Sequence, residues 1–217
     1  MRGIGKALML TAAFVTLWAG AASALVIDFS TGGGGAGGTV NTGGGNVTGS
    51  GIFINDVTIT GAPVNNGVFN VDGAGVCADA IGGCGLLSFD RNANTISIVG
   101  SIPAQPGWIG PAISLQALLS GNLSGGVTVD VLGPGSITAS GQDTKSRELL
   151  IALGLDPTTP FAFFGFVLTF NNAQGVPTAI STDIRNTAVP EPGSLALLGT
   201  GITAVAMSVR RRFGKKS

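Results

Sequence analysis

The chain has 217 residues, with 11 basic and 11 acidic side chains, 37 glycines, 2 cysteines, no histidine and no tyrosine. The lack of histidine excludes Ser-His-Asp triads, Cys-His pairs and histidine metal sites. Residues 25–188 hold four basic and ten acidic side chains, a formal charge of −6. This charge argues against nucleic-acid binding, which needs basic residues to replace counterions.

The first 24 residues are typical of a secretory signal peptide. Basic residues precede an apolar run over residues 7–21, and Ala22 and Ala24 occupy the positions that a signal peptidase reads. We therefore expect residues 1–24 to be removed and the mature chain to begin near Leu25. An uncleaved membrane anchor is the alternative.

Residues 25–188 are long enough for one domain with one core. Residues 31–51 are more than half glycine, and backbone entropy opposes ordered packing of such a stretch. We expect a flexible loop there. The sequence argues against a phosphate-binding loop, because neither its lysine nor its following helix is present.

The rest of the domain shows short alternating runs of β-branched and aromatic residues between turn residues, which predicts antiparallel strands in a β-sandwich or jelly-roll. The expected strands are Ile52–Thr60, Gly67–Val71, Leu86–Asp90, Thr95–Gly100, Val127–Leu132, Ser136–Ser140 and Phe161–Phe170.

Two segments carry a helical pattern. Ala112–Gly121 fits a short helix or a strand. Asp143–Pro157 predicts a helix that is capped by Asp143 or Ser146 and buries a leucine face at one end of the sandwich.

The two cysteines, Cys77 and Cys84, are separated by six residues that include two glycines. In an exported chain this spacing predicts a small-loop disulfide. Two buried free thiols are the alternative. Two thiols without histidine do not make a metal site, so we expect no metal and no other cofactor.

Few residues of the domain suggest chemistry. Nothing singles out a pair of acids for glycoside hydrolysis, and we expect no enzymatic activity. Asp90, Asn92 and Asn94 alternate as calcium ligands do, but the glycine and the closing glutamate of an EF-hand are missing, and these residue types also favour turns. Trp108 could stack on a sugar or pack against the core.

The C-terminal segment combines an apolar run with a basic tail. The 17 uncharged residues of 193–209 would form a helix of about 25 Å, short for a bilayer core of about 30 Å. The basic tail favours the cytoplasmic side, which leaves the β domain outside. Its three arginines are Arg210, Arg211 and Arg212.

This segment resembles the PEP-CTERM sorting signal. The match consists of the apolar run, the arginines and the motif Val189, Pro190, Glu191 and Pro192. The prolines keep the backbone around Glu191 extended and open to a protease. The domain end, with "GQDTKSRELLIALGL", "PFAFFGF" and "STDIRNTAVPEP", is similar to one recurrent group of these proteins. A plain single-pass anchor is the alternative.

The resemblance implies an exported protein sorted by an exosortase-type membrane protease-transferase. On that basis residues 25–188 form the ectodomain and residues 189–217 the sorting signal. We expect the ectodomain to face the periplasm from the inner membrane of a Gram-negative bacterium. It would then reach the outer surface or the matrix, associated with exopolysaccharide, biofilm or floc. A carbohydrate-binding or carbohydrate-hydrolysing surface module is the competing interpretation.

Overall fold

The computed structural model describes residues 25–31, 37–76, 83–124, 127–130, 134–171, 177–188 and 201. The predicted signal peptide lies outside these residues, and so does the predicted membrane helix except for Gly201. In the part of the chain that is described, no helix is both long enough and apolar enough to cross a bilayer.

The described part of residues 25–188 is a mainly β, antiparallel domain, as the sequence predicted. Its strands and its helix are β1 (Val26–Ser30), β2 (Thr39–Asn41), β3 (Thr48–Ile54), β4 (Asp56–Thr60), β5 (Gly67–Asn70), β6 (Gly85–Asp90), β7 (Thr95–Ile102), β8 (Ile113–Asn122), β9 (Thr128–Asp130), β10 (Gly135–Lys145), α2 (Arg147–Ala152), β11 (Phe161–Asn171) and β12 (Thr178–Ala188).

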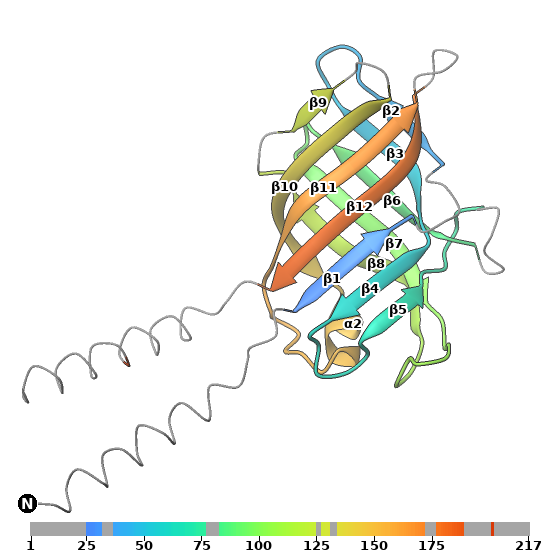
Figure 1. The fold of residues 1–217 in the computed structure, drawn as a ribbon, viewed down its shortest axis with the longest axis vertical. Coiled ribbons are helices and arrows are strands. Elements are labelled where there is room, and N and C mark those ends of the chain that lie inside the picture. Colours follow the sequence, from blue (N-terminus) through green and yellow to red (C-terminus); the bar gives the residue numbers. More distant parts are fainter. Residues whose placement is uncertain are drawn as a thin grey trace, which may run out of the picture.

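The strands form one continuous antiparallel sheet rather than two separate ones. Its order is β2-β3-β6-β7-β8-β10-β11-β12-β1-β4-β5, and β9 pairs with β10. Figure 1 shows the sheet curling over, so that β10, β11, β12, β1 and β4 lie in front of β3, β6, β7 and β8. Many neighbours in the sheet are also neighbours in sequence, so the connectivity is closer to a meander than to the predicted jelly-roll.

Aromatic and aliphatic side chains fill the space between the two halves of the curled sheet. The rings of Phe89 on β6 and Phe166 on β11 meet edge to face, with centroids 5.1 Å apart. β11 lies between β10 and β12, which confirms its prediction as a central strand. At Gly165 φ is +81° and the register shifts, so Phe163 and Phe166 both face the core although they are three positions apart.

Helix α2 is shorter than predicted and begins later. Ser146 is its N-cap, and the hydroxyl oxygen accepts a hydrogen bond from the backbone N–H of Leu149 at 3.2 Å. Leu149, Leu150 and Leu153 are buried in the common core. Figure 1 shows α2 at one end of the curled sheet, where its leucine face closes the core as predicted.

Two other segments differ from the expectation or decide between alternatives. The glycine-rich range 31–51 is not a single loop, because it contains β2 and the start of β3. Glycine allows this packing: a Cβ on Gly49 would lie 2.1 Å from the ring of Phe89. The range Ala112–Gly121, which fitted a helix or a strand, is β8.

Candidate functional site

The end of β10 directs two charged side chains into the core. The register with β11 shifts between Ala139 and Gly141, and beyond this bulge Asp143 and Lys145 are the buried positions of the strand. Only glycine fits at 141, because a Cβ there would lie 1.8 Å from the carbonyl oxygen of Asn122. Lys145 Nζ and Asp143 Oδ2 form an ion pair with no solvent exposure of either side chain.

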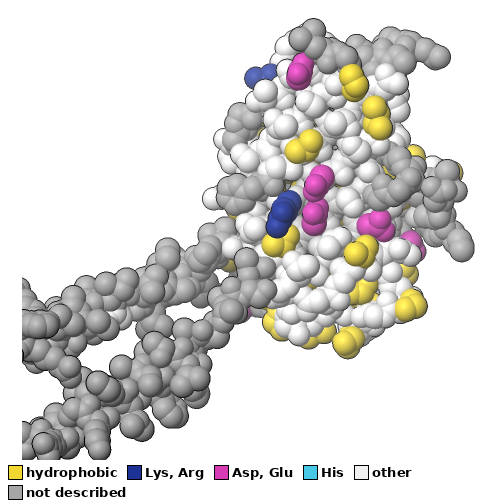
Figure 2. Space-filling model, in the orientation of Figure 1, with side chains coloured by type: hydrophobic (Ala, Val, Ile, Leu, Met, Phe, Trp, Pro, Cys, Tyr) yellow, Lys and Arg dark blue, Asp and Glu magenta, His cyan; other side chains and the backbone are white. Residues whose placement is uncertain are grey.

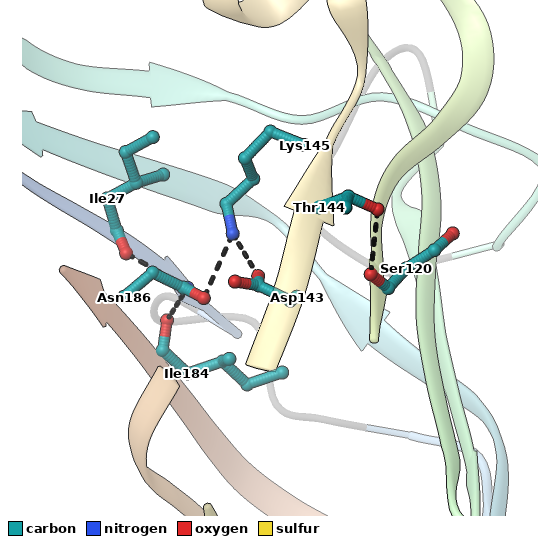
Figure 3. A network of polar contacts seen from close by, with 7 residues as sticks. All are labelled: Ile27, Ser120, Asp143, Thr144, Lys145, Ile184 and Asn186. Carbon is teal, nitrogen blue, oxygen red and sulfur yellow. Dashed lines mark hydrogen bonds and ion pairs between the residues drawn. The ribbon is translucent and has the colours of Figure 1, made fainter. Parts of the chain in front are cut away.

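Asn186 on β12 completes this cluster from the opposite side of β11. Its Oδ1 accepts a hydrogen bond from Lys145 Nζ at 2.9 Å. Its Nδ2 donates to the carbonyl oxygens of Ile27 at 3.1 Å and Ile184 at 2.9 Å. Figure 3 shows these contacts converging between β1, β10 and β12. The two backbone acceptors therefore hold the amino end of the carboxamide, and its oxygen is directed at the lysine.

Aromatic rings line the cavity of the lysine. Nζ lies 4.9 Å from the ring centroid of Phe161 and 6.0 Å from that of Phe29, both of them buried. Burial lowers the pKa of Lys145 to about 8, although the charge and hydrogen bond of Asp143 oppose the shift. Burial likewise raises the pKa of Asp143 above its ordinary value, against the effect of Lys145. Both shifts favour the uncharged forms.

The cluster is nearly complete in its hydrogen bonds. Among the described residues, Asp143 Oδ1 has no hydrogen-bond partner. Burying a carboxylate oxygen without a hydrogen-bond partner costs free energy. This cost is smaller when the carboxyl group is protonated and uncharged. The geometry therefore agrees with the direction in which the pKa of Asp143 moves.

A surface groove of about 740 Å³ lies next to this cluster and borders residues Asp143 and Lys145, although neither side chain is exposed to solvent. Residues of β7, β8 and β10 form much of its lining, and the rest comes from α2, the start of β11 and the segment between them. Phe161 also borders it but is buried, so its ring is not a stacking surface. The uncharged polar residues of the lining are Thr95, Ser97, Ser120, Asn122, Gln142, Thr144, Thr158 and Thr159.

The outer face of the sheet carries a small acidic group over β12, β1 and β4. Figure 2 shows acidic side chains beside a basic one on this face. Asp28 pairs in register with Arg185, and Ser30 pairs with both Asp183 and Asp56. Burial and a hydrogen bond with Asp183 raise the pKa of Asp28 to about 7, while Arg185 acts in the opposite direction. No group of three or more acids, cysteines or histidines in the described residues is arranged to hold a metal.

The residues singled out from the sequence have structural partners. Trp108 is buried, packs edge to face on Phe69 at 5.0 Å and donates its indole N–H to the Pro111 carbonyl at 3.0 Å. It is therefore a core residue rather than a sugar platform. The carboxylate of Asp90 accepts the backbone N–H groups of Asn92 at 2.8 Å and Ala93 at 3.0 Å, which is the turn interpretation.

The predicted disulfide is only half within the described part of the chain. Cys84 is buried and exchanges two backbone hydrogen bonds with Gly75, each 3.0 Å long. Cys77 lies outside the described residues. The pairing of Cys77 with Cys84 stays a prediction.

The last strand leads directly into the C-terminal segment. β12 ends at Ala188, which is paired in register with Phe161 of β11. A family model described as the PEP-CTERM protein-sorting motif matches residues 188–212. The chain carries a PEP-CTERM sorting motif. The matched segment therefore begins at Ala188, which is the last residue of β12.

The PEP-CTERM match includes the tetrapeptide Val189 to Pro192 and the arginines Arg210, Arg211 and Arg212. These residues lie outside the described part of the chain, as do Ala22 and Ala24 of the predicted signal-peptidase site. The PEP-CTERM motif indicates an exported protein that is anchored in the membrane and then processed by an exosortase-type enzyme. No curated protein and no solved structure matches the chain.

The cluster of Asp143, Lys145 and Asn186 was missed by the sequence interpretation. Asp143 was considered only as a helix cap, and Asn186 was quoted only as part of a resemblance. One signal was present: Asp143 and Lys145 are opposite charges two positions apart, which places them on the same face of a strand.

Proposed function

We propose that the β domain is a non-enzymatic structural or adhesive protein of the cell surface or the extracellular matrix, associated with exopolysaccharide. The PEP-CTERM motif at residues 188–212 is the observation that carries this proposal. In this function the domain faces the periplasm of a Gram-negative cell while the tail is embedded in the inner membrane. Exosortase then transfers it to the outer surface or into a biofilm or floc matrix.

Two features support a role without catalysis. The chain has no histidine to act as a general base near neutral pH. Its closely paired titratable groups, Asp143 and Lys145, have no exposed side-chain surface, so a soluble substrate cannot reach them without opening of the core. Asp90 and Asp156 accept backbone N–H groups within their own turns, which is a structural role.

A deletion strain tests the role in the matrix. We expect loss of aggregation or of matrix retention, restored by the full chain but not by a chain that lacks Val189–Ser217. Unchanged aggregation in the deletion strain would contradict the matrix role. Full restoration by the shortened chain would show that sorting is dispensable.

Intact-mass measurement of the surface form tests the processing. We expect a mass that lacks residues 1–24 and the tail beyond the region of Glu191. A surface form that still contains Arg210 to Ser217 would indicate a plain membrane anchor. Glu191→Ala should slow the release of the tail.

A carbohydrate-binding module is the second candidate, and the groove beside β8 and β10 favours it. Its hydroxyl and amide side chains match the hydrogen-bonding groups of a neutral sugar. Titration of the cell's own exopolysaccharide should then show binding that Asn122→Ala and Gln142→Ala weaken. Equal binding by the variants and the wild type would exclude the groove. Glycan turnover by the protein would overturn the non-enzymatic proposal.

A further inference from the structure

The cluster in the core of the domain brings an amine, a carboxamide and a carboxyl group together away from solvent. Lys145 Nζ contacts Asp143 Oδ2 on its own strand and lies 2.9 Å from Asn186 Oδ1. The carbonyl carbon of Asn186 is one bond beyond that oxygen. An amine so close to a carbonyl group meets the proximity requirement for acyl transfer.

We propose that Lys145 and Asn186 condense to an intramolecular isopeptide bond between Nζ and Cγ, with Asp143 as the proton-transfer group. The bond would be a self-modification made once per molecule after folding. It is independent of the proposed function, because it rests on contacts within the core and not on the sorting motif.

The reaction balances without a further reagent. A proton passes from the ammonium group of Lys145 to Asp143, and the uncharged amine attacks Cγ of Asn186, which forms the Nζ–Cγ bond. One proton of the attacking nitrogen is then transferred through the Asp143 carboxyl group to Nδ2. The Cγ–Nδ2 bond breaks, ammonia leaves, and a secondary amide remains.

The surroundings promote each part of this reaction. The rings of Phe29 and Phe161 exclude water from Nζ, and desolvation of an amine is a general way to make it nucleophilic. Burial also raises the pKa of Asp143, which allows that group to hold a proton more readily than an exposed carboxyl group and to return it. The carbonyls of Ile27 and Ile184 hold Nδ2, so the Oδ1 side of the carboxamide stays directed at the lysine.

Ammonia leaves when the core opens transiently, because neither the Lys145 nor the Asp143 side chain is exposed to solvent. The groove that is lined by Ser120, Gln142 and Thr144 also borders Asp143 and Lys145. Loss of ammonia to solvent makes the condensation irreversible in practice, because the dilute product does not return to the cavity.

The position of the bond gives it a mechanical purpose. β10 and β12 are not hydrogen-bonded to each other, because β11 lies between them. A Lys145–Asn186 link would join the two outer strands of this trio covalently. β12 is the strand that continues into residues 188–212, so the strand next to the anchor would be locked to the rest of the sheet.

Peptide mapping of the wild-type chain, isolated from its host and denatured before digestion, tests the proposal. Trypsin cannot cut after an acylated Lys145, so we expect one cross-linked product that contains both Lys145 and Asn186. Its mass should be lower than the sum of its two peptides by about 17 Da, the mass of ammonia. Two separate peptides of unmodified mass, with cleavage after Lys145, would overturn the proposal and leave a buried ion pair.

Three variants assign the roles. Lys145→Arg keeps the positive charge but lacks the reactive amine, and we expect no cross-linked product. Asp143→Asn removes the proton-transfer group, so the cross-linked fraction should fall at least tenfold. Thr144→Ala is the matched control, because Thr144 lies between the two residues but faces solvent, and it should retain the link. A cross-link that persists in Lys145→Arg would overturn the assignment to Lys145.

Discussion

The backbone N–H of Ala188 donates a hydrogen bond to the carbonyl oxygen of Leu25, with the two atoms 3.4 Å apart. These residues lie at the two ends of the β domain, one after the predicted signal peptide and the other at the first residue of the PEP-CTERM match. Both ends of the domain are therefore held at the same place on the sheet. The sorting enzyme meets its motif directly beside a folded body and not on a long tether.

The central place of β12 predicts how far the chain can be shortened. A chain that ends at Ala188 keeps every strand, whereas one that ends at Pro177 loses β12 and leaves β11 and β1 without their common neighbour. We expect a cooperative thermal transition by circular dichroism for the first chain and none for the second. A cooperative transition in the shorter chain would show that β12 is peripheral.

Phe166 should be a major contributor to core stability. It is fully buried on β11 and packs on Phe89 across the core. Phe166→Ala removes a large side chain and leaves a cavity, which should lower the free energy of unfolding by about 3–5 kcal/mol. Urea denaturation measures this.

The neighbouring residue is the control for that substitution. Val167 points outward from the same strand, with 38% of its surface exposed. Val167→Ala should cost less than about 1 kcal/mol. Equal losses in the two variants would contradict the inward orientation of Phe166.

Asn65 should stabilise the end of the domain where three segments meet. Its Nδ2 donates to the carbonyls of Ile109 and Ala152 at 3.0 and 2.9 Å, and its Oδ1 accepts from the N–H of Ile109 at 2.6 Å. Asn65→Gly removes these bonds but tolerates the φ of +58°. We expect a loss of about 1–3 kcal/mol in the free energy of unfolding.

Asn65→Ala separates the hydrogen bonds from the backbone conformation. It removes the same bonds and adds the cost of a positive φ for a residue with a Cβ, about 1–2 kcal/mol. We therefore expect the alanine variant to be less stable than the glycine variant. The opposite order would show that the left-handed conformation is not retained in solution.

The raised pKa of Asp28 should make the stability of the folded domain depend on pH. This pKa is raised from 3.8 to about 7 in the folded protein, first by burial and then by Asp183. The folded state therefore binds this proton more tightly than the unfolded chain, and stability falls as pH rises from about 4 to about 7, with no further change above.

Asp28→Asn isolates that contribution. The asparagine side chain cannot ionise. The melting temperature of the variant should therefore exceed that of the wild type above pH 7 and approach it below pH 4. The comparison of the two proteins removes the effects of Asp56 and Asp143, which titrate in both. A constant difference between the two melting curves across this range would contradict a raised pKa at Asp28.

The alternation of apolar and polar residues predicted much of the sheet, but it did not predict the strands with polar side chains at buried positions. β7 and β11 were predicted almost to their ends because Ile, Leu and Phe occupy most of their inward positions. β12 was not predicted, since its buried positions include Thr182 and Asn186. A strand whose inward side chains are polar has no hydrophobic period to detect.

The same limit applies to the cluster. Asp143 was assigned to a helix because acids favour helix starts, yet it belongs to β10. Its burial depends on Lys145 and Asn186, and the asparagine comes from a strand far along the chain. Local sequence patterns carry no information about such a partner, whereas the strand β1, with Ile27 and Phe29 buried in alternation, could have been found.

The position of β1 between β12 and β4 also sets an order of events during export. A chain that crosses a membrane from its N-terminus delivers β1 first and β12 last, so β1 can pair with β4 early but must wait for its second neighbour. Pairing over nearly the whole domain is slow, because closing so large a loop costs entropy. Until the C-terminal strand arrives, one edge of β1 and one of β11 are open to other chains. Each molecule is therefore exposed to aggregation until β12 has both arrived and paired with β1 and β11.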